Sequence, residues 1–301
     1  MVASYFISAA VLASLYSLCC IGLTLTYMTT KVPNFAYGSQ VTIGAYVAFS
    51  LFTFKKITPY VSAPAAFLIG GIVSVVTYLI VLRPMIKRDS SLIALMIATL
   101  AVDTFFVGVF SIYTDYLTNA FRIEDSKLFI LSSADTALFG QRGVFVITPL
   151  ILIAIVLTMH LILTKTKFGI AMRATVENPK LAAISGVNIG LVYLISWFIA
   201  GGLGSLAGCL LTLNNLIEYD IGSLLIVVFF AGSVIGGFEN IYGAVLGGVI
   251  VGASGVLVTL GIAYFVGPWF DAYTSGVPLV LMVIVLILAP HGLTSINLRR
   301  R

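Results

Sequence analysis

Long runs of apolar residues, separated by short polar segments, dominate this chain along its length. We count about nine such runs, with a range of eight to ten because the seventh and ninth are short. A helix needs about 20 apolar residues to cross the roughly 30 Å hydrocarbon core of a bilayer, and most of the runs reach that length. The runs lack the alternation of a membrane β-barrel, so they predict helices. They span approximately 5–28, 36–54, 61–82, 92–112, 143–163, 191–212, 223–237, 244–266 and 276–289.

The composition of the chain excludes a soluble globular protein. Hydrophobic residues make up 60% of its 301 residues and charged residues only 9%, whereas soluble domains carry about 25% charged residues. We therefore expect an all-α fold, a polytopic transmembrane helix bundle in which residues 1–301 form a single membrane domain. The first run has no basic leader and is longer than a signal-peptide core, so residues 1–28 should form the first helix.

Basic residues are distributed unevenly between the two sides of the predicted bundle. With nine spans and an external N-terminus, eleven of the 16 lysines and arginines lie on one side, which the positive-inside rule identifies as cytoplasmic. The net charge of +5 reflects this asymmetry and an attraction to anionic membrane lipid. No basic groove with interleaved aromatic residues indicates a nucleic-acid partner. The eleven are Lys31, Arg83, Lys87, Arg88, Lys165, Lys167, Arg173, Lys180, Arg299, Arg300 and Arg301.

The most informative polar segment is the cytoplasmic loop 164–190. Asn178 and Pro179 form a helix start, because the asparagine side chain can accept from free N–H groups and proline loses no needed donor there. Gly186 suits the helix end. The helix between them, residues 179–185, has about two turns and is too short to cross a bilayer. It either docks on a partner protein or is an ordinary solvated connection; its apolar residues are Leu181, Ala182 and Ile184.

A second polar segment, 113–142, lies on the external side in this topology. It is long for a connector and short for a domain. It could form a lid, a short surface helix or a landing site for an external partner, but we expect a plain loop.

Glycines crowd the C-terminal half of the chain at four-residue spacing, for example Gly204 with Gly208 and Gly232 with Gly236. Such faces of small residues let membrane helices approach closely. We therefore expect tight helix packing in this half of the bundle.

Asp103 is an acidic residue in the middle of an apolar run. An ionised carboxylate there costs several kcal/mol unless it has a partner or water, so Asp103 should face the bundle interior. It either borders a substrate path, where it would contact a substrate ammonium group, or makes a structural hydrogen bond. Four further polar residues near the run ends could contact a cargo weakly or serve as caps and interhelical hydrogen bonds: Gln40, Thr42, Asn214 and Asn215.

The chain carries no sequence motif for catalysis or for a bound cofactor. It lacks the GxxxxGK[ST] phosphate loop, so we expect any ATP and magnesium to be bound by a separate ATPase polypeptide. His160 and His291 have no further ligand at metal-binding spacing. We expect a transport subunit that is not an enzyme, with no catalytic residues, cofactor or metal. An ion-coupled secondary transporter would need carboxylates within its spans, and only Asp103 is available.

Short motifs occur in order over nearly the whole chain. They include Asn34-Phe35-Ala36-Tyr37-Gly38, Arg83-Pro84, Gly169 with Arg173-Ala174, and Gly243-Ala244-Val245-Leu246-Gly247-Gly248. In this order and spacing they resemble the Liv-type branched-chain amino acid permeases of bacterial and archaeal ABC importers. The chain departs from the family pattern at Asn178-Pro179, where an acid-rich pair is expected, and at Tyr37, where a histidine is expected.

The resemblance implies a permease subunit of an ATP-driven importer in a prokaryotic cell membrane. It implies a second permease subunit, identical or a paralogue, together with ABC ATPase subunits and an extracytoplasmic solute-binding protein. The cargo would be a branched-chain, hydrophobic amino acid, or alternatively urea or a short-chain amide. The loop 164–190 would then carry the helix that couples to the ATPase. Its coupling positions are Gly169, Arg173, Glu177, Ala182 and Gly186 from the resemblance, with Asn178 and Pro179 from the helix start.

Overall fold

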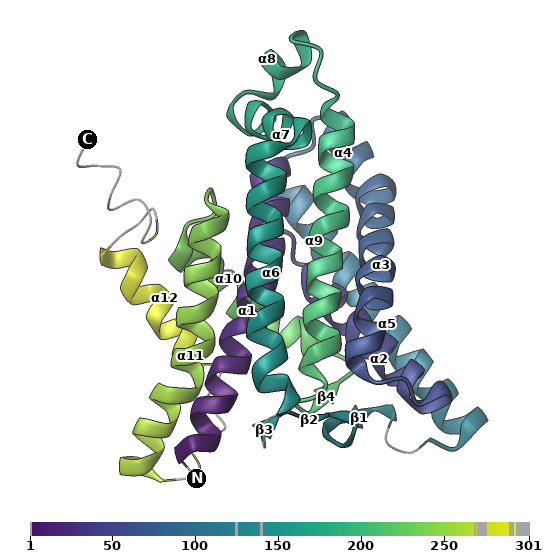
Figure 1. Cartoon of the computed structure of the whole chain (residues 1–301). Coiled ribbons are helices and arrows are strands. Elements are labelled where there is room, and N and C mark those ends of the chain that lie inside the picture. The colour runs from purple at the N-terminus through teal and green to yellow at the C-terminus, as the bar shows by residue number, and fades with distance from the viewer. Residues whose placement is uncertain are drawn as a thin grey trace.

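The computed structural model describes residues 2–123, 126–138, 141–267, 269, 276–288 and 292. The α-helices are α1 (Val2–Thr30), α2 (Tyr37–Lys55), α3 (Pro59–Thr77), α4 (Arg83–Lys87), α5 (Leu92–Phe121), α6 (Gly143–Lys165), α7 (Lys167–Glu177), α8 (Pro179–Ile184), α9 (Ile189–Leu211), α10 (Ile221–Gly236), α11 (Ile241–Val266) and α12 (Gly276–Leu288). A π-helical segment, Tyr78–Leu82, joins α3 to α4. One end of the molecule carries α4, α7 and α8, and the opposite end carries four short strands (Figure 1).

The predicted all-α membrane bundle is confirmed, with fewer long spans than expected. Six helical stretches of 23 to 30 residues are long and apolar enough to cross a membrane, so the chain is a multi-pass membrane protein. Each of the nine apolar runs contains a helix, but two of them form the shorter helices α10 and α12, of 16 and 13 residues. A third forms α2, which has 19 residues but carries polar side chains in its first turns and is not among the six stretches. The described residues therefore give six long spans where about nine were expected.

Both polar segments are more helical than the sequence indicated. α5 continues to Phe121, so the first nine residues of the expected external loop 113–142 are helix. The hydroxyls of Thr114 and Thr118 donate to carbonyl groups of their own helix at 2.8 and 3.0 Å, so the fall in hydropathy after Ile112 does not end the helix. The loop 164–190, which we expected on the cytoplasmic side, starts within α6, ends within α9, and holds two helices where one was expected.

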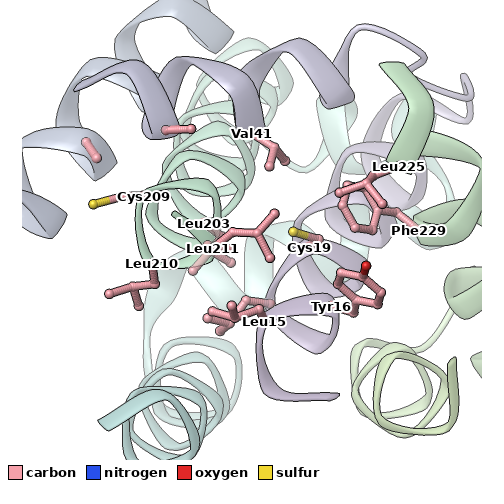
Figure 2. Packing of buried hydrophobic residues seen from close by; sticks show 14 of the residues in the cluster. Leu15, Tyr16, Cys19, Val41, Leu203, Cys209, Leu210, Leu211, Leu225 and Phe229 are labelled. Carbon is pink, nitrogen blue, oxygen red and sulfur yellow. The ribbon is translucent and has the colours of Figure 1, made fainter. Parts of the chain in front are cut away.

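The centre of the bundle lies around α1 and α9. Figure 2 shows Leu15 and Cys19 of α1, Leu203 of α9 and Phe229 of α10 in one buried cluster. The ring of Tyr16 packs edge-on against Phe229 with 5.5 Å between centroids. The three cysteines are free and buried, so they act as small apolar side chains.

Glycines stand where these helices cross most closely, which confirms the expected tight packing. A Cβ on Gly208 of α9 would lie 1.9 Å from the carbonyl oxygen of Val41 in α2. A Cβ on Gly247 of α11 would lie 1.9 Å from the carbonyl oxygen of Gly232 in α10. Only a residue without a side chain allows these backbone approaches.

The described residues between α5 and α6, together with β4, form an ordered layer at the strand end of the molecule. β1 (Leu128–Phe129) pairs with β4 (Ile217–Glu218), and β2 (Ala137–Leu138) pairs with β3 (Gln141–Arg142), both antiparallel. The buried carboxylate of Asp135 accepts from the Tyr60 hydroxyl at 2.5 Å, from Arg142 Nε at 3.3 Å and from the Val144 N–H at 3.2 Å. This network ties the layer to the start of α3 and the start of α6.

Candidate functional site

Two helices begin side by side inside the bundle. α2 starts at Tyr37 and α10 at Ile221, and their second residues are in contact, since a Cβ on Gly222 would lie 1.9 Å from the carbonyl oxygen of Gly38. Both glycines are buried. A helix start has unpaired N–H groups and the positive end of the helix dipole. Two positive ends therefore meet at one place, which we call the helix-start junction.

Asp103 places its carboxylate at the helix-start junction. Ser39 of α2 donates a hydrogen bond to Asp103 Oδ1, and Ser223 of α10 donates to Asp103 Oδ2 at 2.6 Å. Each serine is the third residue of its helix, so the carboxylate lies against the first turn of both helices. Asp103 is 9% exposed, which confirms that it faces the bundle interior. A negative charge here offsets the two positive helix ends.

The start of α10 is capped by Thr42 of α2 and not by the residue that precedes the helix. The residue before α10, Asp220, makes no side-chain capping hydrogen bond. Instead, the Gly222 N–H donates to Thr42 Oγ1 of α2 at 3.1 Å. The structure thus gives Thr42 an interhelical hydrogen bond, one of the two roles expected for it.

Three polar side chains around the start of α2 are buried without a hydrogen-bond partner among the described residues. Asn34, Tyr37 and Gln40 are at most 1% exposed, and the amides of Asn34 and Gln40 and the hydroxyl of Tyr37 are unpaired. Buried polar groups rarely stay unpaired in folded proteins. These three side chains are therefore candidates for contact with water or a passing polar molecule. Gln40 was predicted from its place near the end of an apolar run, whereas Asn34 and Tyr37 were not predicted as path residues.

The remaining two predicted path residues lie elsewhere. Asn214 and Asn215 follow α9 in the turn before β4, and the amide of Asn214 donates to Asn215 Oδ1 at 3.1 Å. Both are partly exposed. Ser39 and Ser223 were not predicted as site residues, although each directly follows a glycine at its helix start. This repeated Gly-Ser pair is the signal that could have found them.

α7 and α8 project beyond the bundle at one end of the molecule (Figure 1). The Thr166 side chain caps α7 by accepting from the Gly169 N–H at 3.2 Å, and the Asn178 side chain caps α8 by accepting from the Leu181 N–H at 3.1 Å. Pro179 is the first residue of α8. The predicted start of this helix is therefore confirmed.

The end of α8 is fixed by Gly186. Its φ of 85° lies in the left-handed region that favours glycine. The Gly186 N–H bonds to the carbonyl of Ala183, and the Val187 N–H bonds to the carbonyl of Ala182, both at 3.0 Å. This pair of bonds is a Schellman motif. The helix ends at Ile184, one residue before the predicted end.

The outer face of α8 is apolar and exposed. Leu181 is 60% and Ile184 is 83% exposed, whereas Ala182 is buried. We call Leu181 and Ile184 the α8 tip. Large apolar side chains exposed together in a polar loop mark an interaction surface. On α7, Arg173 and Glu177 lie one turn apart and are exposed.

Gly169 lies where α7 crosses the last turn of α6. A Cβ on Gly169 would lie 2.1 Å from the carbonyl oxygen of Leu163. Any side chain at this position must push α7 away from α6. The predicted coupling positions thus divide into two kinds. Gly169, Asn178, Pro179, Ala182 and Gly186 set the shape of the α7–α8 segment, while Arg173 and Glu177 offer charge on its surface.

Basic residues gather at the end of the molecule that carries α7 and α8. Arg83 and Lys87 lie on α4, Lys165 ends α6, Lys167 begins α7, and Lys180 lies on α8. The positive-inside rule therefore predicts that this end faces the cytoplasm.

No group of three or more His, Cys, Asp or Glu side chains in the described part of the chain could hold a metal ion. His160 Nδ1 lies 2.7 Å from the hydroxyl of Tyr242. His291 lies outside the described residues.

Comparison with known proteins relates the chain to one family of transport proteins. The family described as "Branched-chain amino acid transport system / permease component" matches residues 5–286. The chain is 40% identical over 292 residues to the "Probable branched-chain amino acid transport permease protein LivH" of Methanocaldococcus jannaschii, covering 97% of this chain and 92% of that protein. It is 25% identical to the high-affinity branched-chain amino acid permease BraD of Pseudomonas aeruginosa, covering 95% and 94%.

A weaker similarity reaches a second group of permeases. The chain is 30% identical over 200 residues to the ribose import permease protein RbsC of Bacillus subtilis, which covers 63% of this chain and 58% of that protein. No solved structure matches the chain.

Proposed function

The chain belongs to the permease components of branched-chain amino acid transport systems, and we propose that it forms part of the membrane path of an ATP-driven importer in a prokaryotic cell membrane. It works beside a second permease subunit, either a paralogue or a second copy. ABC ATPase subunits bind ATP and magnesium, and an extracytoplasmic solute-binding protein delivers the cargo. The cargo is a branched-chain, hydrophobic amino acid.

The α8 tip is the observation that supports coupling to an ATPase. Leu181 and Ile184 are 60% and 83% exposed on a rigid, doubly capped helix. Two apolar side chains in such a position fit a groove on a partner protein, because their burial there would remove them from water. The same end of the molecule carries most of the basic residues, so by the positive-inside rule the partner lies in the cytoplasm.

The opposite end of the molecule supports reception of cargo. A cavity of about 490 Å³ opens there between α2 and the ordered layer that follows α5. Its wall combines apolar side chains, among them Phe49, Phe52 and Phe129, with the polar side chains of Thr53, Lys56 and Ser133. This cavity suits the entry of a small hydrophobic side chain from a solute-binding protein.

The contacts at the helix-start junction give Asp103 and Gln40 different roles. Both carboxylate oxygens of Asp103 already accept a serine hydroxyl, so we assign Asp103 to holding α2 and α10 together. The unpaired amide of Gln40 is free to bind cargo or water weakly. A conduit needs weak contacts, because tight binding slows release.

Uptake assays with the complete transporter in sealed proteoliposomes test the proposed function. We expect uptake of labelled leucine that falls at least ten-fold without ATP and does not change when an ionophore collapses ion gradients. Uptake that survives without ATP but collapses with the ion gradient would assign the chain to the secondary transporters. Uptake of urea or a short amide in place of leucine would support the alternative cargo.

Gly169 offers a direct test of the close crossing between α6 and α7. We expect Gly169→Ala to reduce ATP-driven leucine uptake about ten-fold, because the added methyl group displaces α7, and to lower the free energy of unfolding by about 1–3 kcal/mol. The matched control is Gly190→Ala at the start of α9, where the new Cβ meets only Asn188 Oδ1, at 3.5 Å. Equal uptake by both variants at equal membrane abundance would show that coupling does not depend on the close crossing at Gly169.

A further inference from the structure

A second cavity, of about 500 Å³, opens at the cytoplasmic end of the molecule. It lies between α7 and the turn that joins α10 to α11, with the ends of α1 and α6 behind it. Its volume falls within the range of small-molecule sites. The apolar part of its wall includes Met28, Leu163, Met172, Val176 and Ile241. We call it the cytoplasmic cavity.

The cytoplasmic cavity carries charges of both signs. Arg173 and Glu177 lie one turn apart on α7, and neither forms an ion pair with another described residue. Glu239 comes from the turn before α11 and is held by Lys31 Nζ at 2.9 Å. A free cation and a free anion thus lie close together beside an apolar wall.

This combination selects a narrow class of ligand. A zwitterionic amino acid presents a carboxylate, an ammonium group and a side chain from one carbon atom. The guanidinium of Arg173 suits the carboxylate, the carboxylate of Glu177 suits the ammonium group, and the methionine and valine side chains suit an apolar side chain. An anionic lipid headgroup fits less well, because Glu177 and Glu239 would repel it.

The α8 tip does not compete for this cavity. Leu181 and Ile184 are absent from the cavity wall, and α8 lies beyond α7 at the extremity of the molecule (Figure 1). A partner that docks on the tip therefore uses a different surface.

We propose that the cytoplasmic cavity binds the imported amino acid and slows transport when product accumulates in the cytoplasm. This inference rests on the proposed function for its choice of amino acid. A ligand in the cavity joins α7 to α1 and α11, and α8 follows α7 after a single residue. Bound ligand therefore stabilises one position of the coupling segment and opposes its movement.

Equilibrium binding of labelled leucine to the assembled transporter, held in nanodiscs without the solute-binding protein, tests this site. We expect saturable binding that Arg173→Gln and Glu177→Gln each weaken at least ten-fold. Both side chains are exposed, so neither change should prevent folding. The matched control is Lys180→Gln on α8, which lies outside the cavity wall and should bind leucine as the unaltered protein does.

Ligand analogues separate the two charge contacts. We expect 4-methylpentanoate, which lacks the ammonium group, and isopentylamine, which lacks the carboxylate, each to compete at least ten-fold less well than leucine. Leucine binding unchanged in both variants would overturn the proposal. Loss of binding in Arg173→Gln alone, with competition by anionic lipid, would also overturn it and assign the cavity to a lipid headgroup.

Leucine uptake by the same purified transporter, reconstituted in sealed proteoliposomes with its solute-binding protein, distinguishes failure of this inference from failure of the proposed function. Uptake of leucine without binding in the cytoplasmic cavity would overturn the inference and leave the proposed function standing. Absence of leucine uptake would overturn the proposed cargo and, with it, the identity of the ligand. With both intact, leucine trapped inside proteoliposomes should lower the initial rate of ATP-driven uptake in the unaltered protein and in Lys180→Gln. In Arg173→Gln and in Glu177→Gln, trapped leucine should leave the rate equal to that variant's own rate without trapped leucine.

Discussion

Replacement of Asp103 by alanine is expected to reduce leucine uptake at least 100-fold and to destabilise the helix bundle. The change removes the hydrogen bonds from Ser39 and Ser223, and hydrogen bonds to a charged group contribute about 1.5–3 kcal/mol each. It also leaves two positive helix ends facing each other without a negative charge between them. Uptake in proteoliposomes and the thermal unfolding midpoint in detergent measure the two effects.

A conservative variant at Asp103 and a control variant on the same helix show whether the loss is specific to this carboxylate. Asp103→Asn keeps the shape of the side chain and can still accept from a serine, so it should lose less stability than the alanine variant. Asp115→Ala on the same helix removes only the exposed ion pair with Lys127 and should change neither readout, because exposed pairs contribute little. Unchanged uptake and stability in Asp103→Ala would show that the helix-start junction does not depend on this carboxylate.

Replacement of both α8 tip residues by aspartate is expected to uncouple the chain from its ATPase while the fold stays intact. Leu181 and Ile184 are exposed, so the free energy of unfolding should not fall. Loss of two buried apolar anchors at an interface, at about 2 kcal/mol each, weakens the complex about 1,000-fold. Leucine uptake should become undetectable, and the ATPase should no longer co-purify with the permease.

Lys180→Gln is the matched control for the α8 tip, because it changes charge on the same helix without touching the tip. It should retain both uptake and co-purification. Normal uptake by the double aspartate variant would show that the ATPase does not bind the α8 tip.

Local signals in the sequence predicted the cytoplasmic helix well. Asn178, Pro179 and Gly186 act through neighbours within a few residues, so their cap, start and stop could be read from the chain. α7 was missed because it has no proline at its start and is far less apolar overall than the membrane-spanning helices. Its buried residues, such as Met172, gain their environment from other helices.

The helix-start junction could not be predicted from local signals. Ser39 and Ser223 are 64 and 120 positions from Asp103 in the sequence, and only the folded chain brings them together. The sequence placed Asp103 in the interior because a carboxylate cannot face lipid, but it could not choose the partners. Likewise, the length of an apolar run did not reveal that α2 and α10 begin inside the bundle rather than at its surface.

The sidedness of α8 underlies the whole account, and cysteine labelling in sealed, right-side-out membrane vesicles measures it directly. The native cysteines are at most 1% exposed, so background reaction with a membrane-impermeant maleimide should be low. We expect Lys127→Cys, in the ordered layer at the strand end of the molecule, to react at once. Lys180→Cys on α8 should react only after the vesicles are opened. Equal reaction of both positions in sealed vesicles would place α8 outside the cell, where no ATPase could reach it.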